Sequence, residues 1–229
     1  MKKLICFVLS VFLTFVLTGC GQEEIGTEGL EYMIVADGTY WVAGGETKEL
    51  EEIVIPSKYN GRKVTQIEEA AFEGFYNLER ITIPDSVEII GDMAFNRCGN
   101  LTGVRIPDSV ISIGKGAFLN CYKLESVEIS DGVTTIGNDA FRNCDQLKSV
   151  EIPDSVTTIG SGAFMNCNKI EGVTIPDSVT SIGDNAFHFY ARKPITFLGT
   201  MKEWEEVECG VNAFRAASVI TCDDGEIVF

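Results

Sequence analysis

The sequence predicts a β-rich solenoid, and the main evidence is a 23-residue unit that is repeated without a gap. The unit reads Ile-Pro-Asp-Ser-Val-x-x-Ile-Gly-x-x-Ala-Phe-x-x-Cys-x-x-Leu-x-x-Val-x, and its clearest copies start at Ile83, Ile106, Ile129 and Ile152. A unit this short cannot bury its apolar face alone and must stack on its neighbours. The second observation is the alternation of apolar and polar residues at the end of each unit, which is typical of a strand.

Less regular copies start at Ile55 and Ile175, on either side of the clear ones. The strand pattern Leu-x-x-Val-x-Ile recurs from Leu101, Leu124, Leu147 and, with isoleucine in first place, Ile170. The Ile-Pro-x-Ser-Val…Ile-Gly…Ala-Phe…Cys form resembles the bacterial BspA-type group of leucine-rich repeats, from Ile55 to about Phe214. The resemblance implies a right-handed leucine-rich repeat stack.

Residues 1–19 are predicted to be a lipoprotein signal peptide. Lys2 and Lys3 precede an apolar run that ends at Leu17, which is typical of a secretory signal and too short for a membrane span. The ending Leu-Thr-Gly-Cys20 resembles the bacterial lipobox, which implies cleavage before Cys20 and lipidation of its sulfur. An ordinary signal peptide that happens to end in cysteine is the alternative. We therefore predict a protein anchored by lipid to the extracytoplasmic face of a bacterial membrane or to the cell surface.

Residues 20–29 are polar and contain glycine, so they are predicted to form a tether. A single repeat domain follows, over residues 30–229, and residues 30–54 form its N-terminal cap. Within the cap, Ala36-Asp37-Gly38 separates two apolar segments and predicts a β-hairpin. This hairpin should cover the open strand edge of the first repeat, since exposed edges promote aggregation.

The repeats are assigned to residues 55–196. The first copy carries an insertion at residues 57–63, where Asn60-Gly61 predicts a small protruding hairpin. The phenylalanine of each unit should form a continuous aromatic ladder in the core, comprising Phe72, Phe95, Phe118, Phe141, Phe164 and Phe187.

Four of the eight cysteines occupy one position of the repeat: Cys98, Cys121, Cys144 and Cys167. Phe75 and Tyr190 take this place in the outer copies, so the position favours a buried apolar group. Parallel Cβ directions in stacked rungs do not suit a disulfide, and we predict a core ladder of free thiols. Disulfides and a metal site are the alternatives. Cys209 aligns with Ile182 and is predicted to be buried rather than bridged to Cys222.

Residues 197–229 are predicted to be a degenerate repeat and the C-terminal cap. Thr200-Met-Lys-Glu203 is a capping-box pattern and predicts a short helix. A terminal hairpin is predicted around Asp223-Asp224-Gly225, so that both ends of the array are capped.

Charge excludes nucleic acid as a partner. The chain has 18 basic and 34 acidic residues, and loss of Lys2 and Lys3 with the signal leaves 16 basic residues. The net charge then changes from −16 to −18, without a basic patch to offset it. The membrane is therefore expected to be contacted only through the N-terminal lipid.

No catalytic motif is recognisable, and no enzyme activity or cofactor is predicted. The single histidine, His188, lies where the repeat pattern breaks down, and zinc-type Cys/His spacings are absent. The acidic row, defined as Asp85, Asp108, Asp131, Asp154 and Asp177, recurs once per rung. Each aspartate is predicted to cap backbone amides of its own turn, and calcium binding by the row is the alternative. No metal-ligating residue is assigned.

The outward positions of the strands indicate where a partner would bind. We assign binding to Arg80, Arg105, Glu128 and Glu151, with the Asn60-Gly61 hairpin as a lateral clamp. Arg105 and Glu128 are one rung apart, and their pairing with each other is the alternative reading.

The resemblance implies a binding or adhesion module whose partner is an extracellular or host protein. The alternative is an envelope structural or carbohydrate-contacting lipoprotein without a dedicated protein ligand. A hydrolase is disfavoured because only His188 could serve in a catalytic triad.

Overall fold

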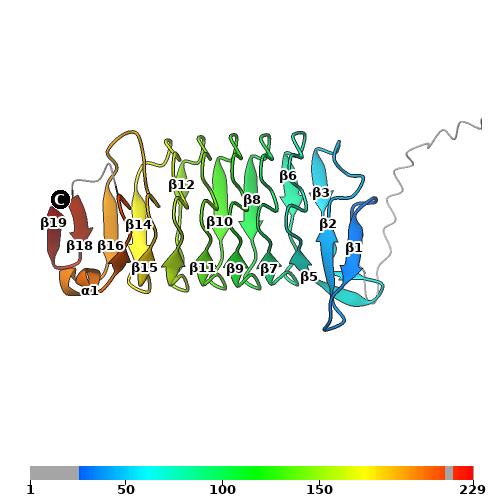
Figure 1. Cartoon of the computed structure of the whole chain (residues 1–229), viewed down its shortest axis with the longest axis horizontal. Helices are drawn as coiled ribbons and strands as arrows, with labels where there is room; N and C mark the ends of the chain where they lie inside the picture. The colour runs from blue at the N-terminus through cyan, green and yellow to red at the C-terminus, as the bar shows by residue number, and fades with distance from the viewer. Residues whose placement is uncertain (1–25, 215–218, 229) are drawn as a thin grey trace, which may run out of the picture.

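The computed structural model describes residues 26–214 and 219–228 and has the form of an elongated solenoid, as Figure 1 shows. The predicted β-rich solenoid of 23-residue rungs is confirmed, and helix is limited to α1 (Met201–Glu205) in the described ranges. Residues 1–19 and Cys20, the predicted signal peptide and lipid site, lie outside the described residues.

Three sheets run along the solenoid, each built mainly from parallel strands of successive rungs. The ten-stranded sheet contains β1 (Glu31–Ile34), β2 (Tyr40–Ala43), β4 (Lys58–Tyr59), β5 (Arg62–Ile67), β7 (Ile89–Ile90), β9 (Ser112–Ile113), β11 (Thr135–Ile136), β13 (Thr158–Ile159), β15 (Ser181–Ile182) and β17 (Glu208–Cys209). The five-stranded sheet contains β3 (Glu52–Val54), β6 (Arg80–Thr82), β8 (Gly103–Ile106), β10 (Ser126–Ile129) and β12 (Ser149–Val150). The four-stranded sheet contains β14 (Val173–Pro176), β16 (Ile195–Leu198), β18 (Val219–Cys222) and β19 (Gly225–Val228).

The phenylalanine ladder is present and fully buried. Phe118 stacks on Phe141 with ring centroids 5.2 Å apart and parallel planes, and the other neighbours repeat this geometry. Phe214 adds a further ring, 5.3 Å from Phe187. The ladder therefore continues beyond the repeats that defined it in the sequence.

The cysteine ladder consists of free, buried thiols, as predicted. Each thiol lies near a phenylalanine carbonyl of the preceding rung; the Cys144 Sγ, for example, donates to the Phe118 oxygen at 3.3 Å. Burial raises the pKa of Cys98 to about 12 and raises the pKa values of Cys121 and Cys144 well above the ordinary thiol value.

We predict that a disulfide reagent will discriminate sharply between these cysteines under native conditions at mildly alkaline pH. Cys209 is exposed and should react first, although partial burial raises its pKa, whereas Cys144 should react only on unfolding. Peptide mass spectrometry after timed labelling checks this. Removal of the fast phase by Cys209→Ser is the control, and fast native labelling of Cys144 would contradict the buried ladder.

Serine and asparagine side chains make the repeated hydrogen bonds of the turns. The aspartates, for which the sequence predicted this role, do not. A serine follows four of the five aspartates, Gly132 follows Asp131, and each serine bonds the preceding rung; Ser109 Oγ donates to the Val87 carbonyl at 2.6 Å, and Ser86, Ser155 and Ser178 do likewise. The expectation that the acidic row caps the turn backbone was wrong, because the turn amide donates to a backbone carbonyl instead, as Val110 N does to the Pro107 oxygen at 3.0 Å.

Asparagines occupy a second turn of the rung, directly before the ladder cysteines, and their role was not predicted from the sequence. Asn120, Asn143 and Asn166 have positive φ angles of 63°, 62° and 65°, a conformation that asparagine tolerates well. Their side chains form a ladder in which Asn143 donates to Asn120 at 2.7 Å and Asn166 to Asn143 at 2.8 Å. The available signal was the asparagine that directly precedes three of the four ladder cysteines.

The two predicted terminal hairpins are present, but each extends only one sheet. The N-terminal hairpin β1–β2 continues the ten-stranded sheet through β5. The C-terminal hairpin β18–β19 continues the four-stranded sheet through β16. At the N-terminal end of the five-stranded sheet, Thr27 instead covers β3, because its amide and hydroxyl bond Val54 at 2.9 and 2.7 Å. The helix and its capping box at Thr200 are confirmed.

Two burial predictions at the C-terminal end were wrong. Tyr190 is 80% exposed, and Phe189 is buried in its place because the irregular loop after Phe187 moves the inward position by one residue. Cys209 pairs with Ile182 as aligned. It is nevertheless exposed, since β17 ends the ten-stranded sheet and no further rung covers it.

Candidate binding groove

A shallow groove of about 450 Å³ lies on the outer face of the five-stranded sheet. It is lined by Glu52, Arg80, Ile81, Thr82, Gly103, Val104, Arg105, Ser126, Val127 and Glu128. The strands that carry these residues are β3, β6, β8 and β10, which are neighbours in the sheet. The groove is thus built from equivalent positions of successive rungs.

Small residues make the hollow. Gly103 lies between Arg80 and Ser126 in the strand register. A Cβ atom at Gly103 would come within 3.1 Å of the Ser126 Oγ. The hollow at this position therefore exists because Gly103 has no side chain and Ser126 has a small one. A larger residue at 103 would fill the groove.

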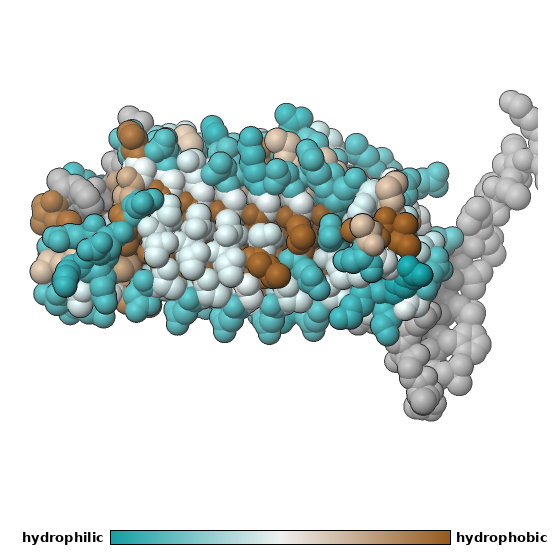
Figure 2. Space-filling view, turned by 60° about the horizontal axis from the view of Figure 1, so that its bottom comes forward, coloured by the Kyte–Doolittle hydropathy of each residue, from teal (hydrophilic) through white to brown (hydrophobic). Residues whose placement is uncertain are grey.

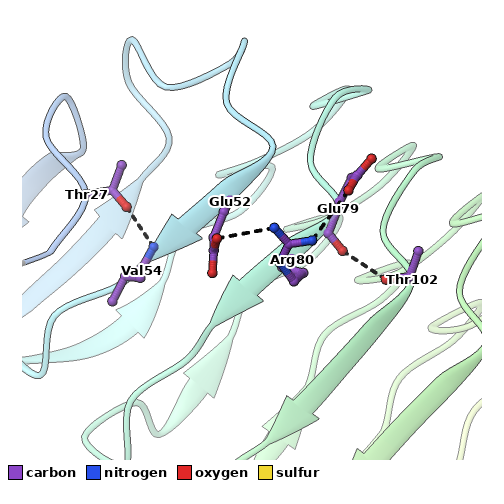
Figure 3. Close-up of polar contacts among 6 residues, drawn as sticks. All are labelled: Thr27, Glu52, Val54, Glu79, Arg80 and Thr102. Carbon is purple, nitrogen blue, oxygen red and sulfur yellow. Dashed lines mark hydrogen bonds and ion pairs between the residues drawn. The ribbon is translucent and has the colours of Figure 1, made fainter. Parts of the chain in front are cut away.

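Arg80 forms one wall, and two carboxylates hold it. Its guanidinium lies 3.3 Å from Glu52 and 3.5 Å from Glu79, as Figure 3 shows. The side chains of Arg80 and Glu52 are 58% and 57% exposed. Ion pairs this exposed contribute about 0–1 kcal/mol, so a ligand can replace them at little cost.

Arg105 is held in the same way, by Asp85 at 3.4 Å and Glu128 at 3.5 Å. Arg105 and Glu128 are direct partners in the register of β8 and β10. The structure therefore contains the ion pair between Arg105 and Glu128 that was the alternative prediction for these residues. Both side chains remain at least half exposed, so they stay accessible to a partner.

The structure brings three of the four predicted binding residues together. Arg80, Arg105 and Glu128 line the groove, whereas Glu151 lies beyond it, in an isolated bridge with Thr174. Glu52 and Glu79 were missed in the sequence. The sequence did contain a signal for Glu52. Glu52 precedes Ile53 as Arg80 precedes Ile81, and the two pairs align once the inserted residues are allowed for.

The Asn60-Gly61 hairpin packs on the N-terminal hairpin instead of standing beside the groove. Tyr59 stacks on Tyr32 with centroids 3.9 Å apart, and Arg62 donates to the Gly38 carbonyl at 3.1 Å. Burial, followed by the proximity of Tyr59, raises the pKa of Tyr32 to about 12. The hairpin is therefore fastened to the cap, and the predicted clamp role does not follow from its position.

The described part of the chain contains no cluster of three or more His, Cys, Asp or Glu residues that could hold a metal ion. His188 is half-buried between Phe187 and Phe189, at the end of the regular rungs. Over residues 26–214 and 219–228, no helix has the length and apolar character needed to cross a bilayer.

Comparison with known proteins shows that this chain is similar to bacterial leucine-rich repeat proteins. Residues 65–192 match six copies of the BspA type leucine rich repeat region. The leucine rich repeat protein of T. pallidum is similar, with 28% identity and a TM-score of 0.68, over 78% of this chain and 87% of that protein. A search of curated proteins finds no match.

A leucine rich cell surface protein from Faecalibacterium prausnitzii A2-165 is also similar. It shares 32% identity over 89% of this chain, with a TM-score of 0.73. This chain spans 56% of the length of that protein.

Proposed function

Because the chain belongs to the BspA-type leucine-rich repeat family, we propose that it is an exported, lipid-anchored module that binds an extracellular or host protein through the groove around Arg80 and Arg105. The observation that carries the proposal is the grouping of two half-exposed guanidinium groups over a hollow made by Gly103 and Ser126. Arginine is enriched at the energetic centres of protein interfaces.

The charges of the groove favour a protein over a nucleic acid or an anionic membrane. Arg80 and Arg105 are each balanced by two carboxylates, so the groove presents alternating charges and not a basic patch. Such alternation sets the specificity and orientation of a protein partner more than its raw affinity. Leucine-rich repeat families are in general non-catalytic scaffolds, and the proposed role requires no catalysis.

Binding through the groove predicts a selective effect of filling it. The chain from Gly21 to Phe229 should be screened in parallel against arrays of extracellular-matrix and plasma proteins and of soluble glycans. For a protein captured in this way, Gly103→Gln and Arg105→Ala should each raise the dissociation constant at least tenfold. Gly99→Gln is the matched control, because a Cβ at Gly99 meets only Tyr122, at 3.7 Å. Equal binding by all variants would place the site elsewhere, and capture by glycans alone would favour the carbohydrate-contacting alternative.

Lipid anchoring predicts a defined mature N-terminus. When the full chain is expressed in a bacterium, mass spectrometry should find an N-terminal Cys20 that carries acyl chains, and the protein should fractionate with membranes. Two buried acyl chains suffice for stable anchoring. The variant Cys20→Ala should lose both the modification and the membrane fraction. A retained Met1, or an unmodified N-terminus after Cys20, would contradict the proposal.

A further inference from the structure

The outer face of the ten-stranded sheet carries a second surface, which does not depend on the groove. Strand register places Met33, Trp41, Gln66 and Ile89 in one column that continues through serines and threonines to Ser181. Met33 is 56% and Ile89 is 41% exposed. Figure 2 shows this face as a pale and brown band with hydrophilic residues along both borders.

A second column lies beside the first and offers few hydrogen-bond donors. It contains Glu88, Ile111, which is 52% exposed, Thr134, Thr157 and Thr180, and the amide of each later member donates to the carbonyl of the one before it. Each of these threonine hydroxyls donates to the backbone carbonyl of the preceding rung, at 3.2 to 3.3 Å. The donors are thus used within the solenoid. We call the two columns together the outer band.

The outer band is long and narrow. It crosses the eight strands from β1 to β15, and seven spacings of about 4.8 Å give a length of about 34 Å. It is at most two side chains wide, roughly 10 Å, so a partner would cover less than about 340 Å². A stable face-to-face dimer needs about 800 Å² from each copy. The outer band therefore has the dimensions of a single α-helix. A helix of about 22 residues has this length and a diameter of about 10–12 Å.

The acidic row borders the outer band on one long side. Each of its aspartates precedes a residue of the second column by three positions, as Asp131 precedes Thr134. Asp85 pairs with Arg105, and no other member of the row has an ion pair within the described ranges. The carboxylates recur at about 4.8 Å, close to the 5.4 Å pitch of an α-helix.

We propose that the outer band binds a cationic amphipathic α-helix that lies along the solenoid axis. Its apolar line rests on Met33, Ile89 and Ile111, and its basic line follows the acidic row. A helix satisfies its own backbone hydrogen bonds, so it suits the second column, whose threonine hydroxyls already donate within the solenoid. An extended peptide or a glycan needs such donors from its receptor. The net negative charge of the chain also favours the approach of a cationic partner.

The probe is a fluorescein-labelled 22-residue peptide of leucine, lysine and alanine, with leucine and lysine in adjacent lines of a helix. Its binding to the chain from Gly21 to Phe229, which includes every described element, is followed by fluorescence anisotropy and circular dichroism. We expect saturable binding with a gain in helicity that weakens with salt. A peptide of the same composition in scrambled order should bind at least fivefold more weakly. Equal affinity of the two peptides would mean charge attraction alone and would overturn the proposal.

Variants locate the site. Ile89→Ser with Ile111→Ser should weaken binding at least fivefold without changing the charge. Asp131→Asn with Asp154→Asn should weaken it and reduce its salt dependence, whereas Glu171→Gln with Glu205→Gln removes the same charge elsewhere and should have little effect. Gly103→Gln should leave peptide binding unchanged, which separates this surface from the groove. Wild-type affinity in both band variants would overturn the proposal, as would absence of binding to the native chain.

Discussion

Phe141→Ala is expected to destabilise the solenoid by about 3–5 kcal/mol, because it removes a fully buried ring from the middle of the ladder. Phe141 stacks on Phe118 and Phe164, with centroids 5.2 and 5.3 Å apart, so its loss leaves a cavity between two rungs. Aromatic pairs add stabilisation beyond the area that they bury. Urea unfolding followed by circular dichroism measures the change in the free energy of unfolding.

The effect should depend on the core position and not on the loss of an aromatic ring as such. Tyr122 belongs to a neighbouring rung but is 50% exposed, and Tyr122→Ala should change stability by about 0.5 kcal/mol or less. Phe141→Leu keeps most of the volume and should fall between the two. A loss below about 1 kcal/mol for Phe141→Ala would mean that the rungs do not share one core.

Gly137→Ala is expected to cost about 3 kcal/mol, at the upper end for overpacking. A Cβ atom at this position would lie 2.7 Å from both the Gly114 carbonyl carbon and the Ile113 oxygen. These are backbone atoms of the preceding rung, and the amide of Gly137 donates to the same Ile113 oxygen at 2.9 Å. The added methyl group therefore forces the rungs apart at a hydrogen bond that holds them together.

Gly99→Ala is the matched control for the same chemical change. A Cβ at Gly99 meets only the Tyr122 ring, at 3.7 Å, which is an ordinary contact. Thermal and urea unfolding should leave this variant within about 0.5 kcal/mol of the wild type. If Gly137→Ala unfolded at the same urea concentration as Gly99→Ala, the close approach of the rungs at Gly137 would be refuted.

The periodic core residues were the ones that sequence analysis placed correctly. The phenylalanine and cysteine ladders follow from the repeat, since a residue that recurs in every rung meets its own copies above and below. The same reasoning correctly predicted that Arg105 would lie beside Glu128. The turn dipeptide Asn60-Gly61 was recognisable because it encodes its own local conformation.

The residues outside the period were harder. Cys209 aligned with Ile182, yet it is exposed because burial in a solenoid requires a rung on both sides. Tyr190 kept the spacing of the cysteine ladder, but the loop after Phe187 turned it outward. Ser109 and its equivalents do recur with the period, but their role was overlooked, since their hydroxyls bond a carbonyl in another rung.

By itself, the sequence determined the stacked architecture, the strand register and the ladder residues of this protein, because a fixed period imposes the same neighbours on every copy. Only the tertiary structure decided what lies at the edges and on the surfaces. It assigned each terminal hairpin to one sheet, fastened the inserted hairpin to the cap, and placed Met33 and Trp41 in line with Ile89. These arrangements join segments that share no repeat, so no local pattern or spacing encodes them.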